Sequence, residues 1–449
     1  MKRSKNGRKA SSRARQPLPV EDVSAGRRWL TPIIAAGALL VPVVMSLSGE
    51  DVFRFPKELA LRAEVILIIV VLSLAWGFGR LGLPRLDFRG RWLALTALIC
   101  AWTIVCALVS TNHLVSIPPT VHVLECGLLF VVTVLVLRAQ PAWFAGIIVL
   151  PAILNGVIYI LQELDIWSPF DTSAVLEKHI GRTALIGNPN DVGGYFVVPA
   201  LVALALALSG RRFRVAWAGV AAFILVATYM THTVAAIGAL AVALFVMFAV
   251  WLRSWAKTFV VFLALVVAAA IPFATYKPLR DRATLMRDAL KRRDFETFSA
   301  ARTLPFLTAA EMISDHPIVG VGPGGFAYNF FDYKLRLQER HRELFEHTTE
   351  MNYAEVHNDH LQVASETGLP GYVLFLAALL LVASASWRHH SVTAATTNDE
   401  SRAEFARLLA LPLAVSLFIL ALAQFPLELV APTHTYLWAA AAIVAWRMS

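Results

Sequence analysis

The sequence predicts an all-α protein that crosses a membrane about twelve times and carries one large loop. Of its 449 residues, 57% are hydrophobic and only 16% are charged, whereas a soluble domain is about 45–50% apolar. The apolar residues gather in runs close to the ~20 residues that a helix needs to cross a bilayer. Basic residues occupy every second connection between these runs. Composition and pattern therefore both indicate a polytopic membrane protein.

The apolar runs give the expected spans in order. They are approximately Trp29–Gly49, Glu58–Phe78, Trp92–Ser110, Pro119–Arg138, Pro141–Leu161, Asp191–Ser209, Arg214–Thr231, His232–Trp251, Thr258–Tyr276, Gly371–Trp387, Leu408–Phe425 and Thr435–Arg447. The first run is too long, and too poorly followed by a cleavage site of small residues, for a removed signal peptide. The chain then divides into a basic tail at 1–28, nine spans within 29–276, a large loop at 277–370 and three spans within 371–449.

The orientation of the spans follows from the Lys and Arg residues of the short connections. The basic connections carry Arg80, Arg85, Arg89 and Arg91, then Arg138, then Arg211, Arg212 and Arg214, then Arg253 and Lys257, then Arg388, Arg402 and Arg407. Basic residues near spans stay on the cytoplasmic side, so both termini are expected there. The loops at 162–190 and 277–370 then lie on the outer face. The larger loop is also basic, but long loops cross membranes largely regardless of charge.

The formal net charge of +9 is concentrated in the tail, where nine Lys and Arg residues precede the first apolar run. A basic tail also suits nucleic acid, but beside a span it more simply retains the tail in the cytoplasm and contacts anionic lipid. We expect no nucleic-acid partner. Cys100, Cys106 and Cys126 lie in apolar runs without the spacing of metal ligands, so neither a disulfide nor a metal is expected.

Polar chemistry is densest in the large loop. In its segment VHNDHLQVASETGLPG, Asn358 or Asp359 is expected to cap a short helix that ends at Gly368. This cap would hold the imidazole of His357 at the mouth of the helix bundle, where a neutral ring accepts a proton near physiological pH. A general base for a sugar hydroxyl needs that property. Alternatively, His357 and His360 are a pair of surface histidines at a helix start.

Two arginines in the outer loops are candidates for binding phosphate. Arg182 lies in HIGRTALIGNPND just before a span, and Arg302 begins a helix in the large loop. A guanidinium is permanently charged and its fork fits phosphate oxygens, so two converging arginines could hold a diphosphate and stabilise it as it leaves. Alternatively, each arginine pairs with loop acids or lipid headgroups.

Three further features could contact a substrate. The turn at 320–325, with sequence GVGPGG, resembles a phosphate-binding loop, but it lacks the Lys-Ser/Thr of a P-loop and is expected first as a tight bend. Asn188 and Asn190 flank a proline at the start of a span, where they could present side chains to a sugar. Lys57 lies near the outer end of an early span, where it either lines a water-filled cavity or snorkels to the interface.

With these residues assembled, the chain resembles the bacterial O-antigen ligase and O-antigen polymerase superfamily, which shares the Wzy-type C-terminal domain. The resemblance rests on GRTALIGNPND, on RTLPFLTAAEMISDHPIVGVGPGGF and on HNDHLQVASETGLPG, with FPKEL as a weaker match. Two positions depart from the pattern. His360 stands where many relatives have an aromatic or aliphatic residue, and His232-Thr233 stands where relatives often carry Ser-Arg.

The resemblance implies a GT-C-like glycosyltransferase in the bacterial inner membrane, with a periplasmic active site. The donor would be a polyprenyl-diphosphate-linked glycan, and transfer would invert the anomeric configuration without a cofactor or a required metal. Carried over by motif, His357 looks like the residue that activates the acceptor hydroxyl, and Arg182 and Arg302 look like the diphosphate-binding arginines. The candidate substrate contacts are Lys57, Asn188, Asn190 and His360.

The sequence leaves the acceptor open. A ligase would transfer to a lipid A core sugar or another surface acceptor, a polymerase to the end of another lipid-linked glycan, and a protein glycosyltransferase to Ser or Thr. The ligase is preferred because twelve spans with the large loop before the tenth match it. A transporter of lipid-linked sugars is the alternative from another class, and it would predict two similar halves. Here only one half carries the large loop.

Overall fold

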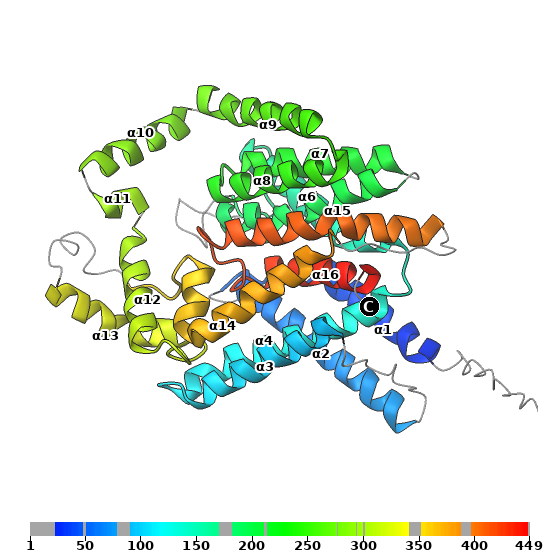
Figure 1. Ribbon diagram of the computed structural model, residues 1–449, viewed down its shortest axis with the longest axis horizontal. Helices are drawn as coiled ribbons and strands as arrows, with labels where there is room; N and C mark the ends of the chain where they lie inside the picture. The colour runs from blue at the N-terminus through cyan, green and yellow to red at the C-terminus, as the bar shows by residue number, and fades with distance from the viewer. Residues whose placement is uncertain are drawn as a thin grey trace, which may run out of the picture.

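A computed structural model describes residues 23–47, 51–78, 90–169, 182–210, 213–275, 277–292, 294–299, 301–340, 352–387 and 397–447. Within these ranges every regular element is a helix, which confirms the predicted all-α class (Figure 1). The helices are α1 (Val23–Leu40), α2 (Arg54–Gly77), α3 (Arg91–Leu108), α4 (His113–Leu137), the 3-10 helix η2 (Ala142–Ile148), α5 (Val149–Glu163), α6 (Pro189–Ser209), α7 (Arg214–Met230), α8 (Val234–Leu252), α9 (Trp255–Thr275), α10 (Lys277–Arg292), α11 (Phe295–Ser299), α12 (Thr303–Asp315), α13 (Gly325–Arg340), α14 (Asp359–Ser384), α15 (Thr397–Leu420) and α16 (Val430–Arg447).

Each of the expected spans coincides with a helix or with a helix pair. In the part of the chain that the structure describes, eight helical stretches are long and apolar enough to cross a membrane, and two shorter apolar helices accompany them. The multi-pass class is therefore confirmed, whereas the number twelve, the GT-C-like arrangement and the sidedness stay predictions. Most of the basic tail, residues 1–22, lies outside the described residues.

Two of the differences from the expected bounds of the spans have local reasons. The first helix ends at Leu40 rather than at 49, because Pro42 follows it and a proline disfavours helical geometry in the residue before it. The fourth helix begins six residues earlier than expected. Its N-cap, Asn112, accepts hydrogen bonds from the backbone N–H groups of Leu114 and Val115, so the helix is already formed when Pro119 is reached.

Helix α6 forms the centre of the bundle. It packs against α7, α8, α15 and α16, and nearly all of its side chains from Asp191 to Ala207 are buried. A helix that is apolar on all sides is buried either among other helices or in lipid. Helix α6 carries no charged residue after Asp191, and other helices surround it. The start of α6, which lies in one of the motif blocks, is therefore a rigid point of the molecule.

The large loop forms a second, smaller core at one end of the bundle. Helices α10 and α11 lead around from α9 to α12, and α12 and α13 then lie beside the start of α14 at the left of Figure 1. The buried side chains of this core include Leu304, Met312, Phe326, Phe330 and Val356. We call this end of the molecule, where α2, α6 and α14 begin, the site end.

The glycine-rich turn packs against a kink in α14. Gly320, Gly322 and Gly324 all have positive φ, and the N–H groups of residues 321 and 322 donate to carbonyl oxygens of residues 365 and 366. Gly368 also has positive φ and interrupts α14, and a Cβ there would lie 2.0 Å from the carbonyl oxygen of Ile318. Only glycine combines that φ with so close a backbone approach. The predicted bend and the predicted end of the short helix are both found.

Candidate functional site

The loop between α15 and α16, residues 421–429, organises the site end. It is joined by hydrogen bonds to three segments that are far apart in sequence. Asn358 donates through Nδ2 to the carbonyl oxygen of Leu422 at 3.0 Å, Arg302 donates through Nη1 to that of Ala423, and Gln424 donates to the carbonyl oxygen of Asn190 at 3.4 Å. The starts of α14, α12 and α6 are thereby held around one loop, which we call the hub loop.

His357 is fixed on the hub loop by its neighbours in sequence. The side chain of Asn358 caps α14 by accepting from the N–H of Leu361 at 3.1 Å, and Asp359 accepts from the N–H of Leu427 at 3.0 Å. His357 itself has φ +59°, a conformation that costs a residue with a Cβ about 1–2 kcal/mol. Backbone strain of this kind persists only where the surroundings impose it, and it is frequent at functional sites.

The His357 ring lies in a half-buried setting between two aromatic rings. Its centroid is 4.8 Å from that of Phe425 and 6.2 Å from that of Tyr353. Within the described residues its Nδ1 is buried and has no hydrogen-bond partner. Burial, and then the positive charge of Arg302, lower the pKa of the imidazole below its ordinary 6.5. A ring with a lowered pKa is neutral at pH 7 and can take up a proton.

An ion pair that the sequence analysis missed lies beside the His357 ring. Arg54, at the start of α2, donates through Nη1 to Glu355 at 2.6 Å. Its guanidinium carbon also lies 5.4 Å from the centroid of the Phe425 ring, which contacts His357. The only sequence signal was the position of Arg54 directly before the weak motif FPKEL. Contacts that join residues 301 positions apart leave no periodic trace in a sequence.

A second acid of the site lies on the hub loop itself. The side chain of Glu428 is exposed, yet the protein around it, and then the like charge of Glu355, raise the pKa of its carboxyl to about 7. Glu428 therefore places a second carboxyl group near the ion pair of Arg54 and Glu355.

Arg182 lies in a neighbouring cluster at the end of α5. Its guanidinium is 3.1 Å from the carboxylate of Glu163 and 3.9 Å from that of Asp165, and His232 approaches Glu163 at 3.7 Å. Thr233 follows His232 and donates to the carbonyl oxygen of residue 189 at 3.0 Å, which joins this cluster to the start of α6. The structure thus brings His357 and Arg302 to the hub loop, whereas Arg182 is paired with Glu163 and Asp165 at the end of α5. A common site for all three residues stays a prediction.

The other candidate contacts are engaged within the protein. Lys57 is 3% exposed and donates to three backbone carbonyl groups, those of Val44, Phe53 and Leu185, at 2.9, 3.2 and 2.6 Å. An ammonium group has three protons, so a substrate contact through Lys57 would require one of these bonds to break. The Lys57 side chain therefore fastens the segment before α6 to the start of α2.

The two asparagines and the second histidine also have internal partners. The Asn188 side chain caps α6, accepting from the N–H groups of Asn190 and Asp191, and the Asn190 side chain accepts from Thr233 at 3.4 Å. His360 is buried, with Nε2 2.9 Å from the carbonyl oxygen of Phe418 and Nδ1 3.3 Å from the Tyr372 hydroxyl. Both ring nitrogens of His360 are thus occupied, which distinguishes it from His357.

The glycine-rich turn binds a carboxylate of its own chain. Glu366, on the first part of α14, accepts hydrogen bonds from the N–H groups of Gly324 at 2.9 Å and Phe326 at 3.3 Å, and Gln362 donates to it at 3.0 Å. Backbone N–H groups that could cradle a phosphate are therefore already occupied by the carboxyl group of Glu366. Across the described ranges, no group of three or more His, Cys, Asp and Glu side chains is arranged to hold a metal ion.

Comparison with known protein families finds a match that covers part of the site end. Residues 219–376 match the family described as O-antigen ligase, a match of about a third of the chain that runs from α7 into α14. It includes Arg302, the glycine-rich turn and His357, whereas Arg54 and Arg182 lie outside it. No curated protein sequence matches the chain. This match confirms the predicted resemblance to the O-antigen ligase-like superfamily over residues 219–376.

Proposed function

We propose that this protein transfers a glycan from a polyprenyl-diphosphate-linked donor to an acceptor hydroxyl, as an O-antigen ligase. The observation that supports this best is His357, which has a lowered pKa and an unpartnered ring nitrogen beside Arg302 on the hub loop. Both residues lie within the region that matches the O-antigen ligase family. A base and a fixed cation side by side suit an alcohol that attacks while a phosphate leaves.

The reaction is a displacement at the anomeric carbon of the donor sugar. His357 takes the proton of the acceptor hydroxyl as the oxygen forms its bond to that carbon. The bond from the same carbon to the diphosphate oxygen breaks, and polyprenyl diphosphate leaves with the electron pair. Attack from the opposite face inverts the anomeric configuration. A diphosphate leaves readily once its charge is held, so the step needs a base and cations but no nucleophile of the protein.

Two guanidinium groups are assigned to the departing diphosphate. Arg302 is held at the hub loop by the hydrogen bond from its Nη1 to the carbonyl group of Ala423. Arg182 has an exposed side chain and is paired with Glu163, so it joins the clamp by exchanging a carboxylate for a phosphate. Both anions accept the same bidentate pattern of hydrogen bonds.

Arg54 competes with Arg182 for this second position, and substitution distinguishes them. Lysine keeps the charge but loses the fork. If Arg182 binds the diphosphate, Arg182→Lys weakens binding of the glycan-free polyprenyl diphosphate to the purified protein about tenfold, and Arg54→Lys changes it much less. The reverse result would assign the clamp to Arg54 and leave Arg182 as a partner of Glu163.

The acceptor is proposed to be a lipid A core sugar or another surface glycolipid. Purified protein in liposomes is mixed with a lipid-linked glycan and with one acceptor at a time: lipid A core, a second lipid-linked glycan, or a Ser/Thr peptide. Product on the lipid A core supports the ligase. Longer lipid-linked glycan indicates a polymerase, and glycopeptide indicates a protein glycosyltransferase.

A transporter is the competing function from another class, and the same reaction mixture tests it. A transporter moves the lipid-linked glycan intact, whereas transfer releases polyprenyl diphosphate. Liberation of polyprenyl diphosphate in proportion to glycosylated acceptor supports the transferase. Translocation of the donor across the liposome membrane with no release of diphosphate would contradict it.

A further inference from the structure

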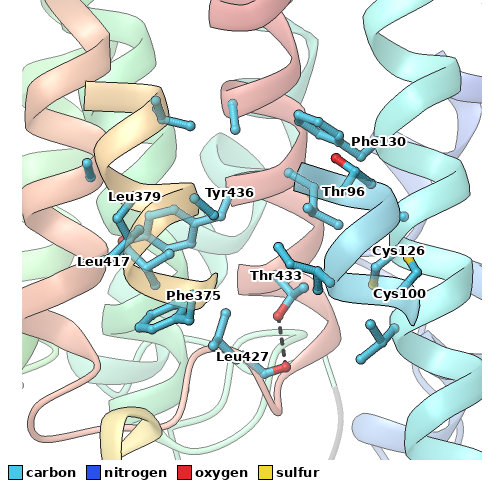
Figure 2. A pocket seen from close by; sticks show the side chains of 18 of the residues that line it. Thr96, Cys100, Cys126, Phe130, Phe375, Leu379, Leu417, Leu427, Thr433 and Tyr436 are labelled. Carbon is cyan, nitrogen blue, oxygen red and sulfur yellow. Dashed lines mark hydrogen bonds between the residues drawn. The ribbon is translucent and has the colours of Figure 1, made fainter. Parts of the chain in front are cut away.

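A cavity of about 320 Å³ lies inside the bundle, between α3, α4, α14, α15 and α16 (Figure 2). This volume falls in the range of about 300–1,000 Å³ that is usual for ligand sites. We call it the tail cavity. None of the side chains proposed as the general base or as ligands of the diphosphate lines this cavity.

The wall of the tail cavity is almost entirely apolar. Leucine, alanine, valine and phenylalanine side chains dominate it. Two of its few polar groups are engaged internally, because the Thr433 hydroxyl donates to the carbonyl oxygen of Pro426 at 2.8 Å and the Tyr436 hydroxyl lies 3.2 Å from that of Ser416. The cavity therefore suits a hydrocarbon and offers little to a sugar or an anion.

The cavity is elongated along the bundle. On α16 its lining residues run from Thr433 to Ala440, and on α14 from Phe375 to Val382. Seven residues of helix rise about 10 Å, which is about a third of the ~30 Å hydrocarbon core of a bilayer. Figure 2 shows Leu427 and Thr433 at one end of the cavity and Phe130 toward the other. This shape suits a segment of an extended lipid chain.

The hub loop lies at one end of the cavity. Leu427 lines the cavity, and its backbone N–H donates to Asp359, two residues after His357. Phe425 precedes Leu427 by two residues and contacts the His357 ring. The same short loop thus faces the apolar cavity with one side chain and the candidate base with another. Arg302 is hydrogen-bonded to this loop as well.

We propose that the tail cavity binds the first isoprenoid units of the donor, so that the attached diphosphate is presented at the hub loop. This inference rests on the proposed function for the identity of the donor. Lipid tails are as apolar as leucine side chains, so the cavity gains little hydrophobic free energy over the bilayer. Its effect is orientation, and a displacement of about 1 Å at a reacting centre can cost about 10²-fold in rate. A chain joined to a diphosphate is selected over phospholipid because only its headgroup fits the cations beside the hub loop.

Photolabelling tests the cavity without requiring transfer. The full-length protein in nanodiscs is irradiated with glycan-free undecaprenyl diphosphate that carries a diazirine in its second isoprenoid unit. Labelled peptides are expected from the cavity faces of α14 and α16. Ala378→Phe and Ala440→Phe place a ring in the cavity. Each is expected to reduce the labelling about tenfold or more, because the size of an apolar pocket discriminates hydrocarbons by about 10–200-fold.

The matched control lies on the same helix as Ala378. Leu380 is 70% exposed and does not line the cavity, so Leu380→Phe is expected to leave the labelling unchanged. Excess undecaprenyl phosphate should compete for the label, and excess phosphatidylethanolamine should not. Equal competition by the phospholipid, or labelling that is indifferent to both cavity variants, would overturn the proposal. Size-exclusion profiles identify any variant that misfolds, and the remaining variant then decides.

Donors of two chain lengths separate this inference from the proposed function. Ala378→Phe is expected to slow transfer from an undecaprenyl-linked donor by about tenfold or more. It should slow transfer less from a donor whose diphosphate carries only an ethyl group, because that donor has no isoprenoid unit to enter the cavity. Equal slowing with both donors would contradict a role in chain binding. If the wild-type protein used neither donor, the proposed function would fail, and the photolabelling would still decide whether the cavity binds the chain.

Discussion

The α6 bundle and the hub loop are held together by different interactions. In the bundle, α6 is surrounded by apolar side chains of α7, α8, α15 and α16, and burial is nearly complete. At the hub loop, the starts of three helices meet through side chains that donate to backbone carbonyl groups. Loss of apolar contacts in the bundle lowers stability, whereas loss of a directed hydrogen bond at the hub loop displaces the side chains that it holds in place. Substitutions in the two regions should therefore separate stability from activity.

The largest expected effect is the loss of the candidate base. His357→Ala should lower glycan transfer by about 10²–10⁴-fold, which is the usual contribution of general base catalysis. It should leave folding intact, because the ring has no hydrogen bond at Nδ1 and Asn358 still caps α14. Initial rates with purified protein measure the loss.

His316→Ala is the matched control for this substitution. His316 lies in the same family-matching region, and its contribution to the end of α12 is a backbone N–H bond that alanine preserves. The rate of glycan transfer by the His316→Ala protein should stay at the wild-type level. A His357→Ala protein that transferred glycan at a rate near that of His316→Ala would contradict the base assignment.

The sequence predicted the two regions unequally. Apolar runs located the bundle helices because burial requires apolar residues wherever a helix lies. His357 was found because a cap, a short helix and a glycine follow it in order. The role of the hub loop was not predicted, since it uses backbone carbonyl groups, which every residue has. Arg302 and Ala423 are 121 positions apart, and neither residue type indicates the other.

The contrast between His357 and His360 shows the same limit. The two lie three positions apart at a helix start, and the local pattern does not indicate which of the two rings is buried. Tertiary packing separates them, because His360 turns into an aromatic cluster with Tyr372, Phe375 and Phe418. Its partners come from another helix and from the helix beyond the Gly368 kink. That arrangement depends on the fold and is not encoded in the local pattern.

A smaller effect is expected when the guanidinium group of Arg302 is replaced by an ammonium group, which keeps the positive charge but cannot form two parallel hydrogen bonds. Arg302→Lys should lower transfer by about 10–10²-fold, somewhat less than the 10²–10³-fold that follows removal of a whole stabilising donor. The ammonium group reaches either the hub loop or the diphosphate but does not span both. Transfer rates and binding of glycan-free polyprenyl diphosphate measure the two contributions. Full donor binding and turnover in this variant would exclude a bidentate role.

The pH dependence of transfer should report the setting of His357. The base is active when neutral, so activity is retained above its pKa and falls as pH drops through it. Burial and the charge of Arg302 lower this pKa. The fall in activity on the acid side of the pH profile, the acid limb, should therefore have its midpoint below pH 6.5. In Arg302→Gln, which removes a cation, the limb should move to higher pH even though the rate is lower. A limb that stayed in place would mean that another group titrates.

The smallest effect on turnover is expected in the bundle itself. Leu201 lies on α6 and is fully buried, and Leu201→Ala opens a cavity that costs about 2–5 kcal/mol in soluble cores. The low end applies here, because a bilayer solvates the lost methyl groups as well as the protein interior does. The transition temperature of the purified protein should fall while the transfer rate per folded molecule stays unchanged. A loss of turnover comparable to that of Arg302→Lys would show that packing around α6 reaches the hub loop, and that the two regions are not independent.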